Sequence, residues 1–242
     1  MRHRSFSLPL ILAVISSIAM LCTTVHSQEN DKEKNEKSPI LLRVLCKQPV
    51  PGATDLTIVQ EEQAIHDLTI SASLMTEPLG IKRGELLLAR STGGAENPSF
   101  DPVLKVPIPS EGKRFVLALF ASPKPTPAKP YQFRLIRTDG LRFGASDLYM
   151  FNLTTLPIGG VLGKEKFSLA ADAFDIVTPK PEEVGGRMYQ SRFYCKIDDQ
   201  VKIFNDTRWP LALSARVYIF FIPDPERQSI GYLSFREYAP FP

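Results

Sequence analysis

The sequence predicts an all-β protein built as an antiparallel β-sandwich. Apolar and polar residues alternate over short stretches, and this period of two is typical of half-buried strands. The stretches are separated by Pro, Gly, Asp and Asn, which favour turns. The 21 prolines are spread along the 242 residues, so long helices are not expected, because proline breaks a helix from within. The composition is that of a globular chain, since 43% of the residues are hydrophobic and 23% are charged.

Residues 1–27 have the pattern of a secretory signal peptide. A basic start precedes an apolar stretch over 8–22, and small residues follow at a cleavage site near Ser27. We therefore expect a secreted or periplasmic protein that does not span the membrane after cleavage. Residues 28–38 are polar, charged and almost free of apolar side chains, which predicts a disordered leader.

From residue 39 onward the alternation predicts strands in both halves of the chain. In the first half these are 40–47, 55–60, 66–74, 84–90, 102–107, 114–121 and 131–137. In the second half they are 147–153, 158–163, 166–170, 173–178, 187–197, 200–205, 214–222 and 228–237. The runs 115–121 and 217–222 are apolar on both faces, which predicts one central strand in each half.

The domain boundary is predicted near Asp139-Gly140. The proline-rich stretch 122–130 is interpreted as a stiff surface loop between two strands rather than as a linker. We expect two packed Ig-like modules, over 39–140 and 141–242. The alternative is one continuous large sandwich.

The pattern F-N-x-T-x-x-P occurs twice, at 151–157 and at 204–210. Each copy predicts a strand that ends in Phe, then a turn in which Asn and Thr bond the local backbone and Pro stops the ladder. The predicted turn residues are Asn152, Thr154, Pro157, Asn205, Thr207 and Pro210. Both copies are N-x-T sequons, so a eukaryotic source would make them glycosylation sites on surface turns. The flanking residues do not align, so the sequence does not support a full duplication.

Cys46 and Cys195 are the two cysteines outside the predicted signal peptide. An oxidising compartment, an even count and inward-looking strand faces predict a disulfide between them. The alternative is two separate buried thiols that pack as small hydrophobes.

Histidine limits the chemistry that this chain can supply. Only His66 lies outside the predicted signal peptide, and its neighbour Asp67 would point to the opposite face of a strand, so a Ser-His-Asp triad is not expected. One histidine and two cysteines are too few for a blue-copper site or for a zinc site built from these ligands. The formal net charge is only +3 and the sequence has no block of basic residues, so we expect no nucleic-acid partner. The sequence also has no cofactor motif, so we expect no cofactor.

Two further kinds of site need no local motif. Adjacent carboxylates at 61–62 and 198–199 are interpreted as solvated loop charges, and a hydrolase that uses carboxylates alone is a third functional alternative. The single tryptophan, Trp209, lies beside Pro210 and is a candidate platform for a sugar ring, together with nearby Tyr or Arg side chains.

Several C-terminal segments carry a family resemblance. They are Arg208-Trp209-Pro210, Ser214-Ala215-Arg216, residues 220–225, residues 233–237, Phe151-Asn152-Leu153-Thr154 and the hairpin pieces 162–163, 167–169 and 176–179. With these segments the chain resembles a group of uncharacterised exported bacterial β-sandwich proteins over roughly the last hundred residues. Ala171-Asp172 stands where members usually show Pro-Gly. The resemblance implies an all-β fold in a bacterial envelope, and it implies no activity or catalytic residue.

The expected function is that of an exported, non-catalytic envelope protein that acts as a structural or protein-interaction module. Its expected partner is another envelope protein, contacted through exposed strand edges. The alternative is a module that binds envelope polysaccharide through Trp209.

Overall fold

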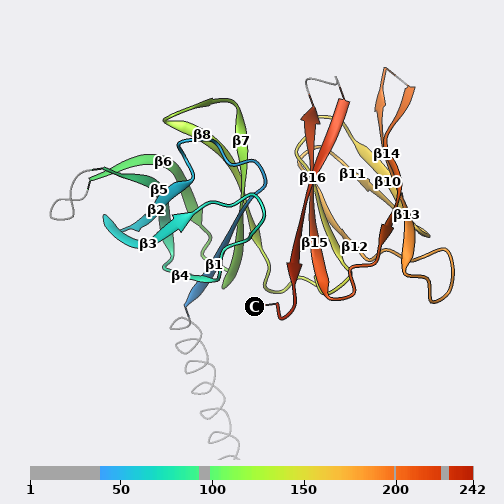
Figure 1. Ribbon diagram of the computed structural model, residues 1–242, viewed down its shortest axis with the longest axis horizontal. Coiled ribbons are helices and arrows are strands. Elements are labelled where there is room, and N and C mark those ends of the chain that lie inside the picture. The colour runs from blue at the N-terminus through green and yellow to red at the C-terminus, as the bar shows by residue number, and fades with distance from the viewer. Residues whose placement is uncertain (1–38, 93–98, 199, 225–228, 242) are drawn as a thin grey trace, which may run out of the picture. The chain divides into compact units, whose positions relative to one another are not determined.

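The structure, a computed structural model, describes residues 39–92, 99–198, 200–224 and 229–241. The predicted signal peptide and leader lie outside these residues. Ile40–Pro242 forms one compact unit, and its described residues are strands, turns and bends, which confirms the all-β class (Figure 1). No helix in the described part of the chain is long and apolar enough to cross a bilayer.

The strands fall into two modules of four-stranded sheets. The first module contains β1 (Ile40–Cys46), β2 (Asp55–Gln60), β3 (Gln63–Thr69), β4 (Leu79–Ile81), β5 (Gly84–Thr92), β6 (Ser99–Ile108), β7 (Arg114–Thr126) and β8 (Lys129–Arg137). The second contains β9 (Leu148–Asn152), β10 (Ile158–Leu162), β11 (Glu165–Leu169), β12 (Phe174–Val177), β13 (Met188–Ile197), β14 (Gln200–Pro210), β15 (Ala215–Asp224) and β16 (Ser229–Tyr238).

The two modules repeat one topology. The first module has sheets in the order β4-β1-β7-β8 and β3-β2-β5-β6, and the second has β12-β9-β15-β16 and β11-β10-β13-β14. Raising each strand number of the first module by eight gives the order of the second. The pairs β1–β7 and β9–β15 are both parallel, whereas all other strand pairs are antiparallel. The duplication is therefore one of topology. The repeated F-N-x-T-x-x-P motif is unrelated to it, because both copies lie in the second module.

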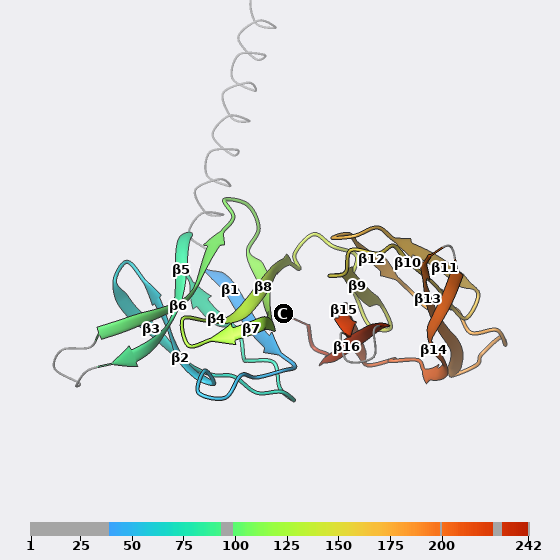
Figure 2. The same cartoon turned by 90° about the horizontal axis from the view of Figure 1, so that it is seen from above.

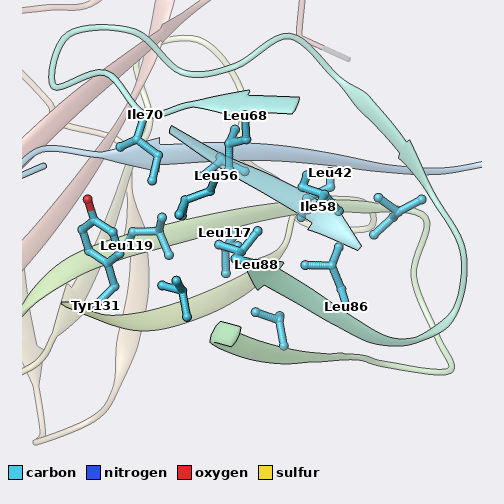
Figure 3. Packing of buried hydrophobic residues seen from close by; sticks show 14 of the residues in the cluster. Leu42, Leu56, Ile58, Leu68, Ile70, Leu86, Leu88, Leu117, Leu119 and Tyr131 are labelled. Carbon is cyan, nitrogen blue, oxygen red and sulfur yellow. The ribbon is translucent and has the colours of Figure 1, made fainter. Parts of the chain in front are cut away.

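Strand β7 contributes to two different apolar clusters because its side chains alternate. Phe115, Leu117 and Leu119 point into the core between the sheets of the first module. Figure 3 shows Leu117 and Leu119 packed toward side chains from β1, β2 and β5. The intervening residues, Val116, Ala118 and Phe120, belong to another cluster on the opposite face of the sheet. The run is apolar on both faces because both faces are buried.

Strand β15 follows the same rule in the second module. Val217, Ile219 and Phe221 point into that module's own core, whereas Tyr218 and Phe220 join the cluster that contains the outer residues of β7. The rings of Phe120 and Phe220 meet edge to face, with centroids 5.0 Å apart. Both runs lie in central strands, as predicted, because β7 lies between β1 and β8, and β15 lies between β9 and β16.

A buried ionic network accompanies the shared cluster. The Glu237 carboxylate accepts a hydrogen bond from Arg43 Nη1 at 2.7 Å and from Arg216 Nε at 2.6 Å. Tyr218 Oη donates to the same carboxylate at 2.8 Å, and Arg216 Nη1 donates to the carbonyl of Phe143 at 3.1 Å. The Glu237 side chain is 1% exposed, so its charge depends on these partners rather than on water.

The proline-rich stretch 122–130 differs from its prediction as a loop. Strand β7 continues to Thr126 and β8 begins at Lys129, so the stretch forms the end of a hairpin. The pairing passes from Ala121 opposite Tyr131 directly to Thr126 opposite Lys129. This break in register accommodates prolines, which cannot donate a hydrogen bond to a regular ladder.

Candidate binding cleft between β14 and β16

One side of the second module is bordered by two edge strands from different sheets. Strand β14 ends the sheet β11-β10-β13-β14, strand β16 ends the sheet β12-β9-β15-β16, and the two strands approach each other (Figure 2). Two hollows lie along this side, with volumes of about 680 Å³ and about 200 Å³, and both are lined by Tyr232. We call this region the β14–β16 cleft, and its parts the large hollow and the small hollow.

The small hollow arises from the residues on the inner face of β16. In the first module, the corresponding edge strand β8 turns Phe133 and Leu135 toward the core. The inner face of β16 instead carries Tyr232, Ser234 and Arg236, all of which line the small hollow. A serine and an exposed arginine fill less space between two sheets than Phe and Leu do. The space next to them therefore stays open.

Trp209 lies on β14 and lines the small hollow from the opposite sheet. The centroid of its ring lies 5.4 Å from Phe193, 5.6 Å from Tyr232 and 6.4 Å from Tyr189. The contacts with Phe193 and Tyr189 are edge-to-face and the contact with Tyr232 is tilted, and together they fix the orientation of the indole. The side chain is half-buried, so part of the ring remains available to a ligand.

Polar groups without partners converge on the small hollow. Tyr189 lines it and is 2% exposed as a whole residue, and its hydroxyl, which has no hydrogen-bond partner among the described residues, keeps some contact with solvent. The same holds in this part of the chain for the Trp209 indole N–H, the Ser234 hydroxyl and the Arg236 guanidinium. Burial raises the pKa of Tyr189 well above its usual value, and the charge of Arg236 opposes this only in part. Tyr189 is therefore protonated at neutral pH and can donate a hydrogen bond.

Asn205 lies beside Tyr232 rather than in the predicted turn. Strand β14 runs through to Pro210 and pairs with β13 along its length, so the predicted turn at Asn205, Thr207 and Pro210 is wrong. A bulge opposite Phe193 absorbs the irregularity, and the proline is tolerated because it ends an edge strand. Asn205 Nδ2 donates to the carbonyl and to Oγ of Ser191, at 2.8 and 3.0 Å, and Tyr232 Oη donates to Asn205 Oδ1 at 3.3 Å.

The first copy of the motif has a different environment, away from the cleft. Asn152 is the last residue of β9 and is fully buried. Its Oδ1 accepts hydrogen bonds from the backbone N–H and the hydroxyl of Thr154, and its amide donates to backbone carbonyls on both sides of the bend. A fully buried amide is inaccessible to glycosylation in the folded protein.

The predicted disulfide is wrong, because Cys46 and Cys195 are both free thiols. Cys46 belongs to the core of the first module and Cys195 to the core of the second, so two inward-looking faces need not look into the same interior. Burial raises the pKa of the Cys46 thiol to about 11, although a hydrogen bond with the backbone of Gln48 lowers the pKa in part. Burial also raises the pKa of Cys195. The structure matches the alternative, two separate buried thiols.

The other candidate residues for catalysis lie apart from the cleft. His66 is on β3, and its Nε2 donates to the carbonyl of Gly80 at 2.7 Å. Glu61 and Glu62 form the turn between β2 and β3, where both have positive φ. Asp198 follows β13 with positive φ, and Asp199 lies outside the described residues. Within the described ranges, no group of three His, Cys, Asp or Glu side chains could hold a metal ion.

Two residues of the small hollow were singled out from the sequence: Trp209 as a ligand platform and Pro210 as a turn residue. Its polar and aromatic residues Tyr189, Tyr232, Ser234 and Arg236 were not predicted as site residues. The available signal was the inner face of β16, where every second residue becomes more polar towards the end of the strand. A strand that packs on a closed core keeps that face apolar. The change therefore indicates an opening.

Comparison with known proteins gives no family assignment. No family model and no curated protein matches the sequence. Among solved structures, the chain is similar to a DUF3823 family protein from Bacteroides ovatus, with 10% identity and a TM-score of 0.22, over 72% of this chain and 100% of that one. Both values are too low to assign a fold family or a function to this chain.

Proposed function

We propose that the protein is an exported, non-catalytic binding module of the bacterial envelope and that it holds its partner at the β14–β16 cleft. One observation supports this most directly: the cleft combines accessible aromatic surface with polar groups that have no partner in the described part of the chain. Ser234 and Arg236 are exposed and Trp209 is half-buried, so these groups are open to solvent, and a bound ligand can accept their hydrogen bonds in place of water. Export and the envelope are inferred from the signal-like start and the family resemblance.

A protein partner is the first candidate, and the region around the large hollow favours it. Val201 and Ile203 on β14 are 65% and 54% exposed, and Ile203 also lines the large hollow. Exposed aliphatic side chains beside a hollow are typical of docking surfaces. Both edge strands carry a charged residue on their inward face: Lys202, which pairs with the buried Cys195, on β14, and Arg236 on β16. An inward-pointing charge on an edge strand disfavours the addition of another strand. We therefore propose docking through side chains rather than extension of either sheet.

Envelope polysaccharide is the second candidate, and the small hollow favours it. Trp209, Tyr189 and Tyr232 supply aromatic surface, and Arg236 and Ser234 supply hydrogen-bonding groups beside it. Apolar walls with a few convergent polar groups are characteristic of small-ligand sites.

Site-specific photo-crosslinking tests the first candidate. A photoreactive amino acid would replace Ile203, and the matched control would carry it at Leu74, an exposed apolar residue of the first module. After irradiation in the native envelope fraction, we expect one protein crosslinked at near-equal abundance from position 203 and none from position 74. Equal labelling from both positions, or recovery of polysaccharide without a stoichiometric protein, would contradict a protein partner.

A further inference from the structure

We infer that the small hollow binds a uronic-acid residue of an acidic polysaccharide. The inference rests on the polysaccharide candidate above and adds the charge and the ring chemistry of the ligand. It is carried by the four polar side chains that line the hollow without hydrogen-bond partners among the described residues: Tyr189, Trp209, Ser234 and Arg236.

These groups select a ligand that accepts hydrogen bonds. A guanidinium and an indole N–H can only donate, and a hydroxyl can do either. The lining contains no Asp or Glu, so Arg236 is the only charge that faces the hollow from the residues that line it. An anionic ligand would satisfy that charge without displacing an existing ion pair, because Arg236 forms none within the described part of the chain. Hydrogen bonds to charged groups are the stronger kind.

The size of the hollow indicates a single ring. Its volume of about 200 Å³ is smaller than the roughly 300–1,000 Å³ of sites for drug-sized ligands. The walls from Leu148, Val217 and Ala212 are apolar, and Trp209 and Tyr232 add ring surface. One face of a pyranose ring presents C–H groups to such a wall, while its edge presents oxygens. The neighbouring residues of a polymer would continue outside, because the hollow lies between two edge strands and is not enclosed by a sheet.

A uronic acid meets more of the donors than other ring acids do. Its carboxylate would pair with Arg236, and its ring and hydroxyl oxygens would accept from the Tyr189 hydroxyl, the Ser234 hydroxyl and the Trp209 N–H. An aromatic carboxylate offers the carboxylate alone and gives the other donors no acceptor, so it would form fewer hydrogen bonds in the hollow. A neutral sugar offers the hydroxyl oxygens and leaves the arginine without a counter-charge.

The single tryptophan makes the test direct, because Trp209 supplies all the indole fluorescence of the protein. The chain from residue 28 onward would be titrated with trigalacturonate, with the neutral trimer of galactose and with benzoate, and binding would also be followed by calorimetry. We expect a saturable change with trigalacturonate. Binding of the neutral trimer should be at least about tenfold weaker, which is the typical effect of one lost charged hydrogen bond. Binding of benzoate should be weaker by a similar factor, because it keeps the carboxylate but loses two or three neutral hydrogen bonds of about 0.5–1.5 kcal/mol each.

Three variants assign the effect to the hollow. Arg236→Gln should weaken trigalacturonate binding about 10- to 100-fold. Arg208→Gln, on the same edge strand as Trp209 but outside the lining, removes the same charge and should leave binding unchanged. Tyr189→Phe keeps the packing, removes one donor and should weaken binding a few-fold, with an unchanged circular dichroism spectrum as the check on folding.

The outcomes separate this inference from the proposed function. Equal binding of the neutral trimer, unaffected by Arg236→Gln, would overturn the acidic ligand and keep the polysaccharide function. Tight binding of benzoate that is unaffected by Tyr189→Phe would overturn the sugar. No binding of any of the three by fluorescence or calorimetry would overturn the site itself, and a protein partner at the large hollow would still stand.

Discussion

Replacing Asn152 with alanine tests whether one sequence motif has two structural roles. The Asn152 amide donates to the carbonyls of Leu156 and Ala170, at 2.8 and 2.9 Å, and more weakly to that of Leu169 at 3.3 Å. Its Oδ1 accepts from the Thr154 N–H at 2.9 Å and from the Thr154 hydroxyl at 2.8 Å. Alanine removes four short hydrogen bonds from a fully buried site. At about 1 kcal/mol each, the loss of unfolding free energy is about 4 kcal/mol.

The matched control is Asn205→Ala, at the same position of the second motif. Asn205 is half-buried, makes two short bonds to Ser191 and accepts one long bond from Tyr232, so at the same rate we expect a loss of about 2 kcal/mol, half that at Asn152. Urea unfolding followed by circular dichroism measures both values. Asn152→Asp adds a further check, because its stability should rise as acid protonates the buried carboxylate and restores a donor. Equal losses for the two alanine variants, or a loss below about 1 kcal/mol at Asn152, would refute the reasoning.

Three further predictions concern buried charge, thiols and pH. Glu237→Gln should lower the unfolding free energy by about 3–5 kcal/mol in a urea titration, because it leaves buried guanidinium groups without their carboxylate. The control is Glu85→Gln at an exposed ion pair, which should change the unfolding free energy by less than about 1 kcal/mol. Cys46 and Cys195 should both be alkylated in the denatured, unreduced chain. Both should resist alkylation in the folded protein, where burial raises the pKa of each thiol. If only one of them, or neither, reacts after denaturation, the prediction is contradicted. At Asp139, burial raises the pKa, but hydrogen bonds from two backbone N–H groups and a neighbouring arginine outweigh it and lower the pKa overall. A carboxyl whose pKa is lowered by folding contributes stability above its unfolded pKa of about 3.9, and this stability is lost as the pH falls through the folded pKa. Asp139→Asn should therefore be less stable than the parent at pH 7 and equally stable in strong acid. Thermal unfolding measured against pH tests this.

The strands could be predicted from sequence because alternation is a local property. β7 and β15 were identified as central from their apolar faces alone, and pairing confirms this. β4 was missed because its three residues, Leu79–Ile81, are too few to show a period. The prolines at 123 and 125 suggested a loop, and only the break in pairing with β8 shows how a hairpin accommodates them. Such information depends on a partner strand and is absent from a single segment.

The errors at the site have a common physical origin. Alternation tells which residues point inward, and it does not tell which interior they reach. Cys46 and Cys195 point inward into two different cores. Asn152 and Asn205 share a motif, but Asn152 is buried in a bend whereas Asn205 lies on the edge strand β14. Trp209 was singled out by its rarity. The tyrosines, the serine and the arginine that share the hollow with it come from β13 and β16, so only the tertiary fold brings them together.

The repeated topology explains why the second module, rather than the first, carries the candidate site. In both modules the last strand is an edge that borders the opening between the sheets. In the first module that strand turns Tyr131, Phe133 and Leu135 inward, and the Tyr131 hydroxyl bonds the backbone at Val50 and Ala53, so aromatic and polar groups alike are used in packing. In the second module Ser234 and Arg236 leave space and donors unused. The same edge of the fold is thus filled by apolar side chains in the first module and left open in the second. Ser234→Leu, which would fill the small hollow as Leu135 helps to fill the first core, should raise stability while it abolishes trigalacturonate binding.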